Sequence, residues 1–502
     1  METMTLLMHG FAVALTPESI MFAIIGAILG TLIGALPGLG PANGVAILIP
    51  LAFSLGLSAT SSLILLTSVY AGAMYGGRIS SILLNIPGDE PAMMTCLDGY
   101  PMALKGKAAE ALAISAIASF IGSFIATVGL VILAPILAKF ALKFGPSEYF
   151  ALFVLAFATL GGVTGKNQFK TIMAAALGLM IATVGIDIST GVQRYTFNML
   201  ELFEGVDFII AIVGLFAISE LFFFIERHAG DGLKQVAINK LKLTAADIIR
   251  VLPASVRGGL LGFVAGVLPG AGASLGSFIS YSLEKKISDK GEFGKGDPRG
   301  VAAPESGNNG AASGALVPML TLGVPGSGTT AVLLAMLISL NISPGPMLFQ
   351  QNADLVWGVI AAMFVGNLVL LLLNIPMIGI FVKLLSIPPK YLMPVVTLIA
   401  SVGIYAVSHS AIDLYFMVAF GVLGYILRKV DIPLVPVILG MLLGPEMEKN
   451  LRHALVLSDG DWSVLFNSGL SITLWTISVL GLVLPIVVGP IIRSKMSKSK
   501  EV

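Results

Sequence analysis

Charged residues are scarce in this sequence. Of its 502 residues, 11% are Asp, Glu, Lys or Arg and 56% are hydrophobic, whereas a soluble domain carries about 25% charged residues. Too little polar surface remains to cover a soluble globule of this size, and lipid is the solvent that tolerates such a composition. The apolar residues form continuous runs of about twenty, not the alternating segments of about ten that are typical of an outer-membrane barrel.

Cysteine and histidine are also rare. The single cysteine, Cys96, excludes an intramolecular disulfide and a cysteine-rich metal or iron–sulfur site. The four histidines lie far apart and form no cluster with ligand spacing. The net charge of +1 gives no indication of a nucleic-acid partner. We therefore predict no cofactor, and no metal beyond Na⁺ in the role of a coupling ion.

Several catalytic and nucleotide-binding motifs are missing as well. There is no complete dinucleotide fingerprint, no phosphate-binding loop, and no hydrolase or metalloprotease motif. ATP-driven transport and hydrolysis within this chain are therefore unsupported, and the chain is not predicted to be an enzyme. No Lys or Arg precedes Arg78, so a cleaved signal peptide is not expected, and the first membrane helix would serve as its own insertion signal.

Glycine and long apolar segments are what the sequence has in abundance, with 57 glycines and 26 prolines. Both residues are frequent in membrane helices, where glycine permits close helix packing. Gly-Pro and Pro-Gly pairs interrupt several of the apolar segments. These features predict an all-α integral membrane protein with about 10–12 transmembrane helices plus re-entrant or broken helices. The apolar segments are residues 19–36, 44–57, 60–86, 108–140, 148–163, 168–187, 205–225, 258–283, 311–324, 328–342, 353–384, 391–408, 411–427, 432–444 and 464–492.

A basic stretch divides the apolar pattern into two halves. It precedes a restart of the pattern near residue 258, and the positive-inside rule places both this stretch and the basic C-terminal tail in the cytoplasm. The predicted organisation is a first repeat with broken helices at 1–226, a cytoplasmic basic linker at 227–257, a second repeat at 258–455, and a C-terminal transmembrane helix with a basic tail at 456–502.

The two halves carry matching motifs in the same order and at nearly constant spacing. A repeat built from interrupted helices is typical of secondary transporters, whose broken helices line a substrate site near the membrane midplane. The alternative for each glycine or proline alone is a packing device or a kink. The matches include Gly34–Gly40 with Gly266–Gly272, Leu84–Gly88 with Leu322–Gly326, and Phe120–Gly122 with Phe364–Gly366.

Freed backbone amides and small polar side chains at the helix breaks would suit an anionic substrate. The predicted substrate-binding residues are Gly38, Gly40, Asn43, Arg78, Asn85, Pro87, Gly88, Gly270, Gly272, Ser274, Asn308, Asn309, Pro325, Gly326, Ser327, Thr329 and Thr330.

Charged residues near the first break leave alternatives open. Arg78 could hold a substrate carboxylate, lie at the membrane interface, or pair internally with Asp89 or Glu90. Asp89 and Glu90 could cap a half-helix or help to bind a coupling cation. The polar segment 304–314 could be a solvated loop or an unwound stretch that lines the cavity.

Six motifs resemble the large membrane subunit of the tripartite tricarboxylate transporters, the TctA type, and the resemblance covers about residues 20–490. They are Gly34–Gly40, Tyr70–Gly77, Leu84–Glu90, Asp98–Met102, Ala303–Asn309 and Leu322–Thr330. The resemblance implies a bacterial inner-membrane protein that works with a smaller membrane subunit and a periplasmic solute-binding protein. It also implies transport of citrate-like tricarboxylates or related organic anions, driven by a Na⁺ or H⁺ gradient. By fold-level analogy, we expect inverted repeats and elevator-like movement.

The sequence therefore favours a substrate-translocating subunit of a binding-protein-dependent secondary transporter. The main alternative is a channel or passive pore for small anions, although rings of charge typical of such pores are not evident. A membrane enzyme and a structural scaffold are disfavoured, the first by the missing catalytic motifs and the second by the paired broken helices.

Overall fold

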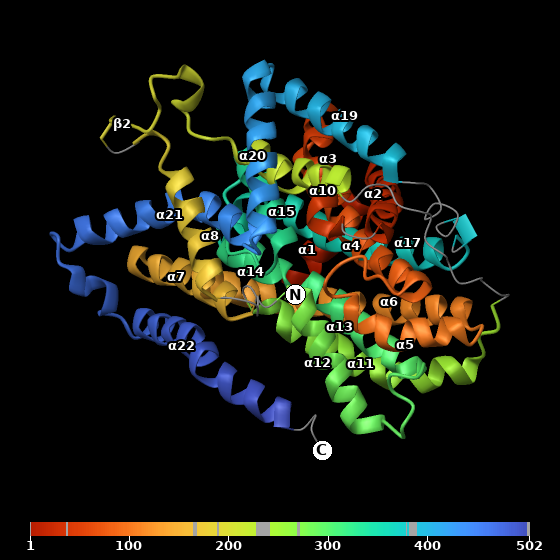
Figure 1. Cartoon of the computed structure of the whole chain (residues 1–502). Coiled ribbons are helices and arrows are strands. Elements are labelled where there is room, and N and C mark those ends of the chain that lie inside the picture. The colour runs from red at the N-terminus through yellow and green to blue at the C-terminus, as the bar shows by residue number, and fades with distance from the viewer. Residues whose placement is uncertain are drawn as a thin grey trace. The chain divides into compact units, whose positions relative to one another are not determined.

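The computed structural model describes residues 2–36, 39–163, 168–187, 190–226, 241–268, 272–377, 379–380 and 389–498. Most of these residues are helical (Figure 1), and the strands within them are β1 (Gly185–Ile186) and β2 (Gln193–Arg194), which pair antiparallel. Six helices in the described ranges are long and apolar enough to cross a membrane, and shorter apolar helices accompany them. The prediction of an all-α integral membrane protein is confirmed.

The chain forms two compact units. The first comprises Met1–Ala141 and Ile209–Tyr425, and the second comprises Leu142–Phe208 and Ile426–Val502. The repeat and linker boundaries proposed above stay predictions. Of the predicted linker, residues 227–240 lie outside the described residues, and residues 245–257 form the start of a long helix.

The first unit contains most of the helices. They are α1 (Glu2–Ala14), α2 (Pro17–Ala35), α3 (Gly40–Ser54), α4 (Ala59–Leu84), α5 (Met93–Leu104), α6 (Ala108–Ala141), α9 (Phe208–Val213), the π-helix η2 (Gly214–Ile218), α10 (Ser219–Glu226), α11 (Ala245–Val267), α12 (Gly272–Ser288), α13 (Pro298–Gly314), α14 (Leu316–Leu322), α15 (Gly328–Ser339), α16 (Leu348–Gln351), α17 (Ala353–Asn374), α19 (Pro389–Ser408) and most of α20 (Ala411–Lys429).

The second unit is smaller. It contains α7 (Pro146–Val163), α8 (Gln168–Ala182), the hairpin β1–β2, η1 (Leu200–Leu202), α21 (Leu434–Leu457), η3 (Trp462–Phe466) and α22 (Gly469–Lys498). Helices α8 and α21 pack so closely that a Cβ on Gly178 would lie 2.0 Å from the Val437 carbonyl oxygen. Asp187 accepts hydrogen bonds from Arg452, which ties the hairpin to α21.

Glycines bring α2 against α4. Gly26, Gly30 and Gly34 lie one turn apart on α2, and a Cβ on Gly30 would lie 2.2 Å from the Val69 carbonyl oxygen of α4. Small residues at this spacing let two helix backbones approach closely in a membrane. From the other side, a Cβ on Gly76 would lie 2.3 Å from the Thr31 carbonyl oxygen.

Helices α11 and α13 pack in the same way, side by side with α12 (Figure 1). A Cβ on Gly262 would lie 2.1 Å from the Gly307 carbonyl oxygen. In the register of the paired sequence motifs, Gly262 corresponds to Gly30, and Gly307 corresponds to Val69. The predicted repeat therefore has matching packing at these positions, whereas the inverted orientation stays a prediction.

The helix breaks also match between the halves. Leu36 and Leu268 end α2 and α11 in extended conformation, and Gly40 and Gly272 then start α3 and α12 with positive φ values of 62° and 66°. A residue with a Cβ is strained at such a φ, which explains the glycine at both positions. The predicted broken helices are confirmed at these sites.

The polar segment 304–314 was expected as a loop or an unwound stretch, and both expectations are wrong. It lies inside α13, every residue from Gly300 to Gly314 is buried, and Asp297 caps the helix by accepting the Arg299 amide hydrogen. Its small residues were read as a loop signal, but they are small because α11, α6 and α12 all pack closely against this helix.

Candidate functional site

A small cavity with a volume of about 30 Å³ lies inside the first unit. The register of the paired motifs relates α4 to α13 and α14, and it relates α6 to α17. The cavity is therefore lined by corresponding helices of the two predicted repeats. Its lining residues are Thr67, Ser68, Tyr70 and Ala71 of α4, Ser123 and Thr127 of α6, Asn309, Ala312 and Ser313 of α13, Leu316 of α14, and Met363, Gly366 and Asn367 of α17.

None of the side chains described as lining this cavity is ionised. Its polar groups are hydroxyls and carboxamides, and these provide hydrogen-bond donors without a negative charge that would repel an anion. Tyr75 donates to Asn367 Oδ1 over 2.9 Å, and Asn367 Nδ2 donates to the Phe120 carbonyl, so the Asn367 amide is held in a fixed orientation. The cavity is therefore lined by neutral polar groups that would not repel a carboxylate.

Asn309 connects the cavity with a buried polar cluster. Its Nδ2 donates to Ser119 Oγ of α6 over 2.9 Å and to the Glu305 carbonyl over 3.0 Å. Ser119 Oγ in turn donates to Glu305 Oε2 over 3.2 Å. All three side chains are buried, so a continuous chain of hydrogen bonds runs from the cavity wall to a carboxylate.

Glu305 lies on α13 at the meeting point of α4, α5 and α6. Thr95 Oγ1 of α5 donates to Glu305 Oε1. With Ser119 donating to Oε2, each carboxylate oxygen accepts one hydroxyl hydrogen. No Lys, Arg or His contacts this carboxylate within the described ion pairs. A fully buried acidic side chain of this kind inside a membrane protein is costly and usually functional.

Arg78 of α4 lies beside this cluster. Its Nη1 donates to Ser119 Oγ over 3.3 Å, its Nη2 donates to Asn374 Oδ1 over 3.1 Å, and its guanidinium stacks on the Tyr75 ring at 4.7 Å. Its Nε has no acceptor in the described part of the chain. Arg78 is 2% exposed and is not part of the cavity lining, and the ion pair with Asp89 or Glu90, one of the three alternatives above, is not among the described ion pairs.

The first Pro-Gly break packs against the end of α2. A Cβ on Gly88 would lie 2.4 Å from the Gly34 carbonyl oxygen and 2.6 Å from Gly77 Cα. Asp89 follows, and its Oδ1 accepts the Ala92 amide hydrogen at the start of α5, which is the capping role considered above. Its Oδ2 is buried without a described partner, whereas Glu90 is exposed.

The second break differs in its side chains. A Cβ added to Gly326 would lie 3.0 Å from the Gly266 carbonyl oxygen, and Ser327 is the N-cap of α15. Ser327 and Thr330 form a capping box, so their polar groups are largely used within the helix start. Tyr70, which lines the cavity, lies 3.4 Å from Ser327 Oγ and brings this helix start close to the cavity.

The structure brings some of the predicted site residues together and separates others. Among them, Asn309 lines the cavity, Asn308 is fully buried with neither amide atom partnered in the described part of the chain, and Gly38 and Gly270 lie outside the described residues. Asn85 is the left-handed C-cap of α4 and is exposed. Buried or half-buried around the breaks are Gly40, Asn43, Pro87, Gly88, Gly272, Ser274, Pro325, Gly326, Ser327, Thr329 and Thr330.

Sequence reasoning missed Glu305, Ser119 and Thr95. Glu305 stands between the apolar runs in the motif Ala303–Asn309, and an acidic residue in an intramembrane segment is itself a functional signal. Ser119 and Thr95 carry no such signal, because serine and threonine are common in membrane helices. Only the packing of α5 and α6 on α13 shows their role.

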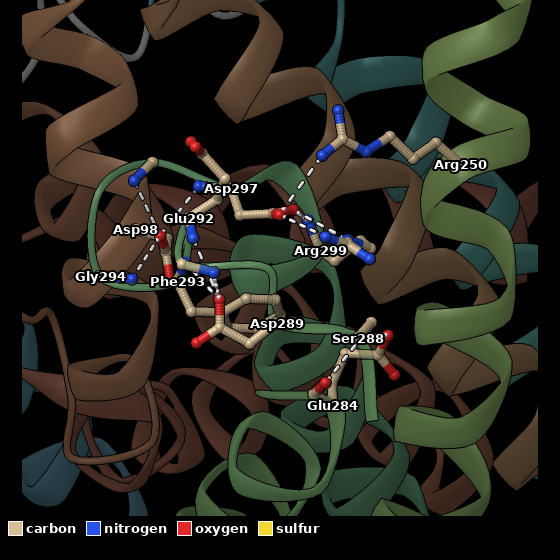
Figure 2. A network of polar contacts seen from close by, with 12 residues as sticks. Asp98, Arg250, Glu284, Ser288, Asp289, Glu292, Phe293, Gly294, Asp297 and Arg299 are labelled. Atoms are coloured by element: carbon tan, nitrogen blue, oxygen red, sulfur yellow. Dashed lines mark hydrogen bonds and ion pairs between the residues drawn. The ribbon is translucent and has the colours of Figure 1, made fainter. Parts of the chain in front are cut away.

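A second polar network holds the loop between α12 and α13 (Figure 2). Asp98 Oδ1 accepts amide hydrogens from Gly294, Gly296 and Asp297 at 2.8–2.9 Å, and its Oδ2 accepts the Tyr281 hydroxyl. Burial raises the pKa of Asp297, but the hydrogen bonds and charge of Arg299, with the charge of Arg250, outweigh burial and hold that pKa below its ordinary value.

Comparison with known proteins identifies the family. Residues 20–439 match the family model described as "Tripartite tricarboxylate transporter TctA family". The chain belongs to this TctA family. It is 40% identical over 499 residues, 99% of each chain, to the "Uncharacterized 52.8 kDa protein in TAR-I ttuC' 3'region" of Agrobacterium vitis.

A second relative comes from the same organism. It is the "Uncharacterized protein in TAR-II ttuC' 3'region", which is 41% identical over 235 residues, 47% of this chain and 96% of that protein. No solved structure matches the chain. Membership in the TctA family makes the chain a multi-pass membrane component of a tripartite transporter, which is a transport protein and not an enzyme.

Proposed function

We propose that this chain is the substrate-translocating membrane subunit of a binding-protein-dependent secondary transporter. It imports tricarboxylates or related organic anions across the bacterial inner membrane, driven by a Na⁺ or H⁺ gradient. Its partners are a small membrane subunit and a periplasmic solute-binding protein. The family membership supports the transport role, and the tripartite architecture named by the family supports the two partners.

The observation that carries the proposal is the cavity between α4, α6, α13 and α17. It is lined by neutral hydroxyl and amide groups, among them those of Ser123, Thr127 and Asn309, and it lies between corresponding helices of the two predicted halves. A carboxylate that enters a membrane protein must exchange its water for donors, and hydroxyl and amide groups supply them. A site between repeats is also where rocking of one repeat against the other would expose a bound solute to alternate sides.

Charge explains why the site would need a coupling ion. An organic anion with two or three carboxylates is expensive to move through a low-dielectric core, and a cation that travels with it offsets part of that cost. Asp89 has a buried carboxylate oxygen without a described partner and stays the sequence-based candidate for the ion, together with Glu90. Asn308, with its unpartnered buried amide, is an additional candidate donor for the substrate.

The experiment is uptake into proteoliposomes that contain this chain and its small membrane partner, with the binding protein outside. Labelled citrate and a panel of dicarboxylates are tested with a Na⁺ gradient, a pH gradient, both or neither. Accumulation above equilibrium that requires the binding protein supports the proposal. Equilibration without accumulation would instead support a passive pore for small anions.

Cavity variants locate the site. Thr127→Val keeps the shape of the side chain and removes a hydroxyl that lines the cavity, so we expect a higher KM for uptake by about threefold to tenfold, equivalent to about 1 kcal/mol. The matched control is Thr476→Val, which makes the same change on an exposed position of α22. Equal uptake in both variants would contradict the placement of substrate in this cavity.

A further inference from the structure

The Ser119 hydroxyl connects the cavity to the buried charged residues, and its hydrogen-bonding capacity is fully used. A serine hydroxyl has one hydrogen to donate and two lone pairs to accept. Ser119 Oγ uses all three: it donates to Glu305 Oε2 and accepts from Arg78 Nη1 and Asn309 Nδ2. Any change in the hydrogen-bonding character of one neighbour must therefore displace another.

Glu305 is the neighbour whose character can change. A carboxylate only accepts hydrogen bonds, whereas a protonated carboxyl also donates one. A proton added to Oε2 would point at Ser119 Oγ, which has no free lone pair for it. Ser119 must then rotate its own hydrogen away and release one of its two donors, Arg78 or Asn309. Asn309 lines the cavity, so a released amide there becomes available to an anion.

We propose that Glu305 is the proton-binding site of this transporter, and that Ser119 links protonation of Glu305 to anion binding by releasing Asn309 or Arg78. The step is a simple proton uptake: one O–H bond forms on the carboxylate, the site gains one positive charge, and no other reactant is needed. The inference rests on the proposed transport function and specifies H⁺ as the coupling ion.

The surroundings of Glu305 favour a proton over a sodium ion. Each of its two oxygens already receives a hydroxyl hydrogen, from Thr95 and from Ser119, so the hydroxyl oxygens do not face a shared cation position. Na⁺ would need several oxygen ligands around one point, and the two hydroxyls that contact Glu305 bind different carboxylate oxygens.

Other charged or titratable groups around Glu305 are few. Arg78 and Tyr75 face it from α4, and Asp89 and Cys96 act on it from the break and from α5. Helix α6 contributes the neutral Ser119. On α11 and α12, Arg257 and Glu284 form their own ion pair at 2.7 Å.

Thermodynamic linkage between proton binding and anion binding fixes the direction in which pH changes substrate affinity. If protonated Glu305 favours anion binding, a bound anion must favour protonation by the same factor. The apparent affinity for substrate should therefore rise as pH falls. We expect KM for anion exchange to be at least about fivefold lower at pH 6 than at pH 8, which is the low end of usual coupling between two sites.

Glu305→Gln tests the proposal in the complete transporter. Glutamine keeps the size of the side chain and can donate one N–H to Ser119, so it resembles the protonated carboxyl. We expect the variant to exchange internal for external anion, to show a KM that no longer changes with pH, and to lose accumulation driven by a pH gradient by at least about tenfold. The matched control, Glu201→Gln, makes the same change at an exposed position of the second unit and should behave as wild type.

The outcomes separate this inference from the transport function. Wild-type accumulation that follows a Na⁺ gradient and ignores pH would overturn the inference and leave the transport function standing. The same holds if Glu305→Gln accumulates anion with wild-type pH dependence, or if a folded variant loses exchange together with accumulation. If the wild-type complex transports no organic anion at all, the proposed function itself fails.

A second variant covers the case in which Glu305→Gln does not fold. Ser119→Ala removes the junction but leaves Glu305 with its Thr95 hydrogen bond. We expect this variant to bind protons and anions independently, so exchange persists and the pH dependence of KM is reduced at least threefold. Unchanged pH dependence in Ser119→Ala would overturn the linkage. Infrared difference spectra provide an independent readout, since anion addition to wild type should produce a protonated-carboxyl band.

Discussion

Gly30 of α2 lies against the Val69 carbonyl of α4, and Gly262 of α11 lies against the Gly307 carbonyl of α13. These corresponding positions have nearly the same separation, 2.2 and 2.1 Å from an added Cβ to the oxygen. The side chains that reach the centre from the same helices are different. In the register that pairs Val69 with Gly307, Arg78 corresponds to Leu316 in the second half.

The buried acidic residues also have no acidic counterpart in the other half. Glu305 of α13 corresponds to Thr67 of α4, and Asp89 at the first break corresponds to Ser327 at the second. Close helix packing favours glycine at the same positions of both predicted halves, whereas the proposed anion and coupling ion would require an asymmetric set of charges. The comparison teaches that, in the predicted register, the two helix pairs pack alike while their charged side chains differ.

The largest expected effect is the loss of stability caused by adding a side chain where two helix backbones are in contact. Gly30→Ala and Gly262→Ala would each place a methyl group about 2 Å from a carbonyl oxygen, so each should destabilise the protein by about 3 kcal/mol or more. The measurement is thermal unfolding in detergent. Gly481→Ala on α22, where an added Cβ meets its nearest atom at 3.9 Å, is the control and should be neutral.

Equal losses of thermal stability in Gly30→Ala and Gly262→Ala would support equivalent packing in the two halves. If Gly30→Ala is tolerated and Gly262→Ala is not, the equivalence of the two helix pairs is wrong.

The division of charge can be tested by a double-mutant cycle. Arg78→Met removes the cation nearest to Glu305 and should cost about 3 kcal/mol, because a buried carboxylate is left without a compensating charge. Adding Glu305→Gln should restore part of this loss, with a coupling energy of about 1–3 kcal/mol in unfolding experiments. Strictly additive losses would show that the two groups do not act as one network.

The two Pro-Gly breaks should respond unequally. A Cβ on Gly88 would lie 2.4 Å from the Gly34 carbonyl oxygen, whereas on Gly326 the nearest atom is the Ala315 Cβ at 2.9 Å. We therefore expect Gly88→Ala to reduce anion uptake by about tenfold, at a cost of about 1.4 kcal/mol, and Gly326→Ala to reduce it less. Both proteins should still insert into the membrane. A larger loss in Gly326→Ala would reverse the order that the geometry gives.

The smallest effect concerns the loop of residues 289–297, whose counterpart in the first half is the short connection 55–58. The pKa of Asp297 is held below its ordinary value, so its carboxylate stabilises the folded loop above the ordinary Asp range, near pH ~4. This stabilisation is lost as pH falls through the lowered folded-state pKa. Hydrogen exchange in the loop should therefore accelerate in acid beyond its intrinsic rate, and Asp297→Asn should remove that acid dependence. An unchanged acid response in Asp297→Asn would exclude Asp297 as its source.

Much of the fold follows from local patterns. Thr16-Pro17 starts α2 in the way such a pair favours, with the Thr16 hydroxyl accepting the Ser19 amide hydrogen, and the breaks at Leu36 and Leu268 fall where the Pro-Gly pairs predict them. These features depend on a few neighbouring residues, which is why sequence alone reveals them. The error at 304–314 has the opposite origin, since Gly307 and Asn308 are poor helix formers in isolation and are helical because neighbouring helices enclose them.

The sequence by itself determined that this is a membrane protein and that it resembles the TctA family, and it predicts two matching halves, because composition, long motifs and spacing are properties of the chain alone. The tertiary structure decided which polar groups meet. Thr95, Ser119 and Glu305 lie far apart in sequence, on α5, α6 and α13, and they form one cluster because the glycine faces of the helix pairs let the backbones approach closely. Contacts of that kind depend on the packing of whole helices, and no local pattern encodes them.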